Sequence, residues 1–201
     1  MRFIMARHPQ TVANTEGRLV GVTNSPYSSE GEKQAEALIK YLSYGSYDEI
    51  LSSPIRRACH IGEMVSQNLS VELNIVEWLR EINFGEYEGV AHKDFIEMGV
   101  DIDDYRENLL HFRYPGGQTW NEFYEDRKQY VDAIKEEDKT CLFTAHGGVI
   151  WAMTTALLNY PLDTIRQPVL SNAGVIVVEY KDGFGKLVSL TEIEEIKSQV
   201  L

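Results

Sequence analysis

Cysteine is scarce in this sequence, whose 201 residues include only Cys59 and Cys141. These two lack the paired spacing typical of a disulfide framework or a zinc site, so we expect two isolated thiols in a reducing compartment. Long apolar runs are also absent, since the N-terminal run, residues 1–6, is too short for a signal peptide or a membrane span. The sequence therefore predicts a cytoplasmic protein with no membrane partner.

Positive charge is in short supply as well. The chain has 19 lysines and arginines against 31 aspartates and glutamates, a formal net charge of −12, which argues against nucleic acid as a partner. An anionic small molecule could bind only where basic residues converge. The apolar content of 43 % is ordinary for a soluble globular protein, and the length suits a single domain over residues 1–201. The sequence does not decide between a monomer and a homodimer.

Short apolar runs alternate with segments of helical periodicity. Strands are predicted over residues 3–6, 49–51, 71–76 and 140–145, and a hairpin at Asp182-Gly183 is predicted to join residues 174–180 to 186–191. Helix starts are predicted from capping patterns at Ser29 with Glu32, at Ser53 before Pro54, and at Thr119 with Glu122. This order predicts an α/β protein, a three-layer α/β/α sandwich with a mostly parallel central sheet and an antiparallel element in its last strands.

Residues 91–118 show the weakest periodicity in the chain. The segment is acidic, then basic around Arg113, and it ends in a Pro-Gly-Gly sequence at 115–117. A segment of this length without clear periodicity inside a compact domain is often a cap or lid over a site. The pattern is equally compatible with a partly helical surface insertion.

Two histidines directly follow predicted strands, His8 after residues 3–6 and His146 after residues 140–145. Ligands of open α/β sheets bind beyond the carboxyl ends of the strands, so the two imidazoles could face each other across one crevice. Further polar candidates also lie at strand ends or in the loop after the third strand: Arg7, Arg56, Arg57 and Glu81. Each residue alone is a weak signal, and the hypothesis of a shared anion site depends on all of them fitting one reaction.

Five segments, in order and at matching spacing, resemble the histidine phosphatase superfamily, also called phosphoglycerate mutase-like. They are residues 6–11 (ARHPQT) followed by Asn14, residues 21–35 beginning at Gly21, residues 52–58 (SSPIRRA), residues 79–89 (LREINFGEYEG) and residues 144–150 (TAHGGVI). The third segment places the functional arginine at Arg57 rather than Arg56. The fourth segment and the chain length look most like the α-ribazole phosphatases and the broad-specificity phosphatases.

The resemblance implies a phosphomonoesterase that needs no cofactor and no metal. Its substrate would be a small phosphorylated metabolite, either α-ribazole 5'-phosphate or several such compounds. A phosphohistidine intermediate is implied at His8, with Glu81 acting first as an acid and then as a base. The implied catalytic residues are Arg7, His8, Arg57, Glu81 and His146, and the implied phosphate-binding residues are Arg7, Asn14, Gly21, Arg57, Glu81, His146 and Gly147.

Elementary chemistry agrees with these roles. Two guanidinium groups can hold the oxygens of a phosphate dianion, and their charge disfavours an imidazolium at His8. A backbone carbonyl that accepts a hydrogen bond from Nδ1 of His8 would leave Nε2 as the attacking atom. The helix that follows Gly147 could direct N–H groups at the same anion.

One departure from the family pattern keeps alternatives open. Pro9 occupies the position of the family glycine, and proline removes an N–H group and fixes φ. A cofactor-dependent phosphoglycerate mutase would use the same chemistry at His8, although the sequence around Glu81 is closer to the phosphatases. A non-catalytic protein that binds phosphorylated ligands is the second alternative, and the intact catalytic residues argue against it.

Overall fold

A six-stranded sheet forms the middle of the computed structural model, which describes residues 1–162 and 170–200. The strand order is β3-β2-β4-β1-β5-β6. Four strands run parallel, namely β1 (Arg2–Arg7), β2 (Glu49–Ser52), β3 (Leu73–Ile75) and β4 (Thr140–Ala145), whereas β5 (Val175–Lys181) and β6 (Phe184–Thr191) pair antiparallel. The prediction of a mostly parallel sheet with an antiparallel end is confirmed.

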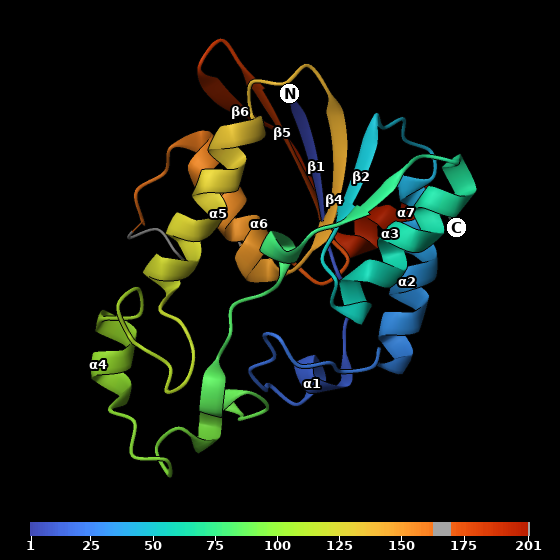
Figure 1. Ribbon diagram of the computed structural model, residues 1–201. Coiled ribbons are helices and arrows are strands. Elements are labelled where there is room, and N and C mark those ends of the chain that lie inside the picture. The colour runs from blue at the N-terminus through green and yellow to red at the C-terminus, as the bar shows by residue number, and fades with distance from the viewer. Residues whose placement is uncertain (163–169, 201) are drawn as a thin grey trace.

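Helices cover both faces of this sheet (Figure 1). One face is covered by α2 (Ser29–Leu42), α3 (Arg56–Leu69) and α7 (Ile193–Val200), and the other by α5 (Trp120–Ile134) and α6 (Gly147–Leu158). Side chains of a strand alternate between faces, so in β1 Phe3 and Met5 join one core while Ile4 and Ala6 join the other. The three-layer α/β/α sandwich is therefore confirmed, with β1 and β4 buried at its centre.

Two of the three predicted helix caps are wrong, one by a single residue and the other by two residues. Helix α2 is capped by Ser28, whose Oγ accepts from the amide of Gly31, so Ser29 is already helical. Helix α3 begins at Arg56, because Ser53 Oγ accepts from the amide of Ile55 and shapes the turn before the helix instead of capping it. The capping box of Thr119 and Glu122 at the start of α5 is confirmed.

The predicted hairpin joins β5 to β6. Asp182 and Gly183 both have positive φ, 53° and 82°, as a two-residue type I′ turn requires. At the other edge of the sheet, the predicted strand over residues 71–76 is reduced to the three residues of β3.

Residues 91–118 lie beyond the carboxyl ends of the parallel strands, at the same end of the sheet as the short helix α1 (Val12–Thr15) (Figure 1). The segment contains η3 (His92–Asp94) and α4 (Ile102–Glu107), and it follows η2 (Gly85–Tyr87). A cluster of aromatic rings in mutual contact holds it together: Phe84, Tyr87, Phe95, Tyr105, Phe112 and Tyr114. The segment is thus partly helical, and its aromatic rings join the larger hydrophobic core through Phe84 and Tyr87.

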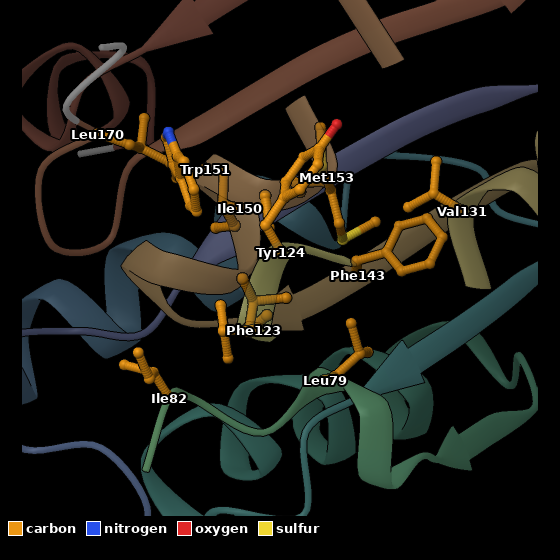
Figure 2. Packing of buried hydrophobic residues seen from close by; sticks show 14 of the residues in the cluster. Leu79, Ile82, Phe123, Tyr124, Val131, Phe143, Ile150, Trp151, Met153 and Leu170 are labelled. Carbon is orange, nitrogen blue, oxygen red and sulfur yellow. The ribbon is translucent and has the colours of Figure 1, made fainter. Parts of the chain in front are cut away.

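The larger of the two cores lies between the sheet and helices α5 and α6. Figure 2 shows Leu79 and Ile82 directed into this core, toward Phe123 and Phe143. Leu79 ends the short helix η1 (Glu77–Leu79), and both Leu79 and Ile82 are fully buried. These two anchors fix the backbone on either side of residue 81. Within residues 1–162 and 170–200, no helix is both long enough and apolar enough to cross a membrane.

Candidate active site

His8 is held rigidly at the carboxyl end of β1. Its amide donates to the carbonyl of Ala145, and its own carbonyl accepts from the amide of Ala173. The side chain is buried, and Nδ1 lies 2.7 Å from the carbonyl oxygen of Pro9. Because that oxygen can only accept, Nδ1 carries the proton and Nε2 keeps its lone pair. The expected carbonyl contact is present, and Pro9 provides it even though proline lacks the N–H of the family glycine.

His146 faces His8 across the end of the sheet. It follows β4, which pairs with β1 so that Arg7 lies opposite Ala145. The two imidazole centroids are 5.3 Å apart and the rings are inclined by 58°. His146 is completely buried, and its Nε2 lies 2.8 Å from Ser53 Oγ. Two residues separated by 138 positions along the chain are thus brought together, as the two-histidine hypothesis requires.

Of the neighbouring arginines 56 and 57, only Arg57 turns inward. Arg57 is 3 % exposed, and it donates to the carbonyl oxygens of Thr23 at 2.7 Å, Gly21 at 2.7 Å and Val20 at 3.1 Å. These contacts use three of its five N–H groups. Arg56 instead lies on the surface in an ion pair with Glu63. The fold therefore agrees with the motif register that selects Arg57.

Arg7 is the second buried guanidinium at this end of the sheet. Its NH1 donates to the carbonyl of Leu170 at 2.5 Å, whereas its Nε is buried without a hydrogen-bond partner among the described residues. Gly147 lies against it, since a Cβ at Gly147 would be 3.4 Å from Nε and Cζ of Arg7. Among the described residues, Arg7 donates one hydrogen bond, so its remaining N–H groups could bind a ligand.

Burial and the arginine charges together set the protonation states of the site. The pKa of His8 is lowered well below its ordinary value, first by burial and then by the charges of Arg57 and Arg7. The pKa of His146 is lowered in the same direction by burial, Arg57 and the neighbouring His8. Burial also lowers the pKa of Arg57 to about 10, so this guanidinium still carries its charge at neutral pH. The site therefore combines two neutral imidazoles with two cations.

Glu81 is held between the loop after η1 and the start of α6. It is 9 % exposed, its Oε2 accepts from the amide of Gly148 at 2.9 Å, and its Oε1 accepts from the amide of Ile82 at 3.0 Å. The Gly148 amide, one of the free donors at the start of α6, is thus directed at Glu81, whereas we expected this helix to direct its donors at the anion.

Asn14 and Gly21 occupy different surroundings from those expected. Asn14 Oδ1 accepts from the amide and hydroxyl of Thr11 and from Asn172 Nδ2, so the described hydrogen bonds of its side chain all involve the oxygen. The amide of Gly21 donates to Glu88 at 3.1 Å, its carbonyl accepts from Arg57, and a Cβ there would overlap the Ile82 carbonyl. Among the described residues, the backbone groups of Gly21 thus bond to Glu88 and Arg57, and its expected contact with phosphate stays a prediction.

Sequence analysis missed several residues that support this arrangement. Ser53 contacts His146, Glu88 holds the amides of residues 21–23, and Asn172 donates to the carbonyl of His8. Ser53 and Glu88 lie inside motif segments that had already been singled out, which is the signal that could have found them. Asn172 lies in a loop that carries no such signal.

Chemically, this site suits an enzyme that moves phosphoryl groups, because a neutral imidazole can attack phosphorus while buried guanidinium groups hold the oxygens. Comparison with known proteins agrees, since residues 3–193 match the model of the histidine phosphatase superfamily (branch 1). The chain belongs to this family.

Among its relatives is the putative phosphoserine phosphatase 2 of Hydrogenobacter thermophilus, 28 % identical over 194 residues that cover 96 % of each chain. Another is the adenosylcobalamin/α-ribazole phosphatase of Escherichia coli, 26 % identical over 170 residues, which cover 82 % of this chain and 83 % of the relative. The crystal structure of the α-ribazole phosphatase from Shigella flexneri shares the fold, with a TM-score of 0.88 at 22 % identity over 96 % of this chain and 97 % of that one. The family and these relatives identify the chain as a phosphoric monoester hydrolase with a small phosphorylated substrate.

Proposed function

We propose that this protein hydrolyses small phosphate monoesters through a phosphohistidine intermediate at His8. The observation that carries the proposal is the 2.7 Å contact between Nδ1 of His8 and the Pro9 carbonyl. This contact leaves the Nε2 lone pair for attack, and the lowered pKa of His8, caused by burial and by Arg57 and Arg7, keeps that lone pair unprotonated at neutral pH.

In the first step, Nε2 of His8 forms a bond to phosphorus and the bond from phosphorus to the ester oxygen breaks. Glu81, entering as the carboxylic acid, donates its proton to the departing oxygen, so an alcohol leaves. In the second step, water attacks the phosphorus, the bond to Nε2 breaks, and the Glu81 carboxylate takes the proton from the water. Phosphate leaves, and His8 and Glu81 return to their starting forms.

Arg7, Arg57 and His146 would stabilise the charge that spreads over the phosphoryl oxygens in both steps. Nε of Arg7 and two N–H groups of Arg57 have no partner within residues 1–162 and 170–200, which supports this role, because such donors are fixed in position before the reaction begins. Gly147, which packs on Arg7, would position that guanidinium, and Asn14 would contribute a further donor from its amide nitrogen.

The substrate belongs to the class of small phosphorylated metabolites, with α-ribazole 5'-phosphate as the first candidate and broad specificity as the second. The names of the relatives support this choice. We further propose that residues 91–118 act as a cap that selects the alcohol portion, since they lie beyond the carboxyl ends of β1 and β4 (Figure 1), the strands that lead into His8 and His146.

Turnover of p-nitrophenyl phosphate in the presence of EDTA between pH 5 and pH 8 tests the reaction. We expect hydrolysis by the wild type and its loss in His8→Ala, together with trapping of radiolabelled phosphoryl group on the wild type alone after rapid denaturation. Absence of turnover in the wild type at every pH would contradict the proposal and favour a binding protein. Conversion of 3-phosphoglycerate to 2-phosphoglycerate, primed with 2,3-bisphosphoglycerate and without release of free phosphate, would instead identify a mutase.

We also propose a cytoplasmic location, which the two free and buried cysteines, Cys59 and Cys141, support. Fractionation of the source cells tests the location. Light scattering on the purified protein distinguishes a monomer from a homodimer.

A further inference from the structure

A buried serine beside His146 has a role that the proposed mechanism does not yet use. Ser53 lies in the turn between β2 and α3, and both Ser53 and His146 are 0 % exposed. The distance from Ser53 Oγ to His146 Nε2 is 2.8 Å, that of a good hydrogen bond. Either atom of this pair could supply the proton, so the contact alone does not define the state of His146.

The other partners of Ser53 decide the direction of that bond. A hydroxyl offers one hydrogen and accepts through two lone pairs. Ser53 Oγ already accepts from the amide of Ile55 at 3.2 Å. If Nε2 of His146 also donated to it, the Ser53 hydrogen would need a third partner, and within the described residues His146 is the only acceptor in reach. In the opposite direction, with Ser53 donating, the unsatisfied donor is instead the Nδ1–H group of His146, which has no partner among the described residues. A bound phosphoryl oxygen can accept from that Nδ1–H group, whereas the Ser53 hydrogen would still lack an acceptor, so with an anion bound the Ser53 hydroxyl donates to Nε2.

Neighbouring hydroxyls are committed elsewhere and do not change this assignment. Ser52 Oγ donates to the backbone carbonyl of Ser53 at 3.0 Å and accepts from Thr144 Oγ1 at 2.8 Å. Ser52 is 0 % exposed and Thr144 is 1 % exposed, so this pair is closed to solvent. Ser53 Oγ therefore keeps one donor bond, to His146, and one acceptor bond, from Ile55.

We propose that Ser53 fixes His146 in the tautomer that carries its proton on Nδ1, and that this N–H group is the one His146 presents to the phosphoryl oxygens. Nδ1 of His146 is buried without a hydrogen-bond partner among the described residues, on a ring 5.3 Å from that of His8. The inference rests on the proposed function, because the bound phosphoryl oxygens are the acceptor that decides the tautomer. Ser53 acts through His146 and is a positioning residue.

The two histidines then share one tautomer but have opposite roles. The Pro9 carbonyl places the proton of His8 on Nδ1 and leaves the Nε2 lone pair toward phosphorus. The Ser53 hydroxyl occupies Nε2 of His146 and leaves an Nδ1–H donor. One ring is thereby prepared to attack and the other to donate. In the opposite tautomer, His146 would present a lone pair to an anion, which is repulsive.

Nitrogen NMR of the uniformly ¹⁵N-labelled protein with inorganic phosphate near pH 7 reads the tautomer directly and does not depend on turnover. We expect His146, assigned by the loss of its signals in His146→Gln, to show a protonated Nδ1 and an unprotonated Nε2. A protonated Nε2 in the wild type would overturn the proposal. If the tautomer is as expected but p-nitrophenyl phosphate is not hydrolysed, the proposed function fails while the assignment stands.

Variants then test whether Ser53 is the cause. Ser53→Ala should move the His146 proton at least partly to Nε2 and lower kcat for p-nitrophenyl phosphate about tenfold, the loss expected for one hydrogen bond in the transition state. Ser53→Thr keeps the hydroxyl and should restore both the tautomer and the rate. Ser52→Ala is the matched control, since it removes an equally buried hydroxyl that does not contact His146. A Ser53→Ala protein that folds and keeps the Nδ1 proton would refute the role of Ser53.

Discussion

Acidification should destabilise this protein, because His8 and His146 are buried in neutral form. The pKa of each is lowered well below its ordinary value of about 6.5, mainly by burial and then by Arg57. In the unfolded chain both imidazoles regain ordinary values. Between the folded and unfolded values, the unfolded state binds more protons, so the free energy of unfolding falls as the pH falls.

The size of the effect follows from this linkage. For a histidine that remains neutral in the folded protein, protonation of the unfolded state contributes about 0.2 kcal/mol at pH 7 and about 2 kcal/mol at pH 5. Each buried histidine therefore costs about 2 kcal/mol of stability over this interval, and the two together cost about 4 kcal/mol. Since small proteins have free energies of unfolding of about 5–15 kcal/mol, the loss should be readily measurable.

Urea unfolding at pH 7, 6 and 5 in a buffer without phosphate measures this dependence, with fluorescence of the three tryptophans as the signal. The wild type is compared with His8→Gln, in which one buried imidazole is gone and the loss between pH 7 and pH 5 should shrink by about 2 kcal/mol. His111→Gln, at an exposed position, is the control and should follow the wild type. If the free energy of unfolding fell by the same amount between pH 7 and pH 5 in the wild type and in His8→Gln, the reasoning would be refuted.

Three further predictions concern the site. Arg57→Ala should lower kcat/KM by about a hundredfold or more, and Arg56→Ala far less, because only Arg57 is buried at the site. Equal losses in the two variants would contradict the assignment of the motif arginine to Arg57. Glu81→Gln should slow hydrolysis of alkyl phosphates by about 10²–10⁴-fold and that of p-nitrophenyl phosphate much less, because a good leaving group needs little protonation; a uniform loss would remove Glu81 from the acid role. Glu88→Gln should lower kcat/KM about tenfold by loosening residues 20–23 and hence Arg57. The exposed Glu86→Gln is its control, and similar activity in the two variants would contradict the positioning role.

The proximity of the two histidines could be predicted, because the patterns that indicate it are local in the sequence. Each histidine directly follows a short apolar run, and each run forms a central parallel strand. Since β1 and β4 are neighbours in the sheet, their carboxyl ends carry His8 and His146 to the same place. The motif register identified Arg57 in the same way, because it depends only on spacing within seven residues.

Helix starts were predicted less well, because tertiary contacts compete with local capping. Ser28 and Ser29 are both capable caps, but Ser28 is fixed in extended conformation by a backbone bond to the Gln10 carbonyl and a side-chain bond to Gln10. Ser53 looks like a cap before Pro54, yet its hydroxyl is engaged by Ile55 and His146. A single sequence does not reveal such distant partners.

The backbone of the site was the least predictable part. Residues 20–23 are held on one side by Arg57 through their carbonyl oxygens and on the other by Glu88 through their amides. Every residue except proline has both of these backbone groups, so the residue type does not predict which of them form these hydrogen bonds. The same reasoning explains why the Gly148 amide was expected at the substrate and lies at Glu81 instead.

The balance of charge in the site matches a phosphate monoester dianion. Arg7 and Arg57 contribute two positive charges, and His8 and His146 are neutral because burial and the arginines lower their pKa values. A phosphate monoester dianion brings two negative charges, so its binding neutralises the two arginines.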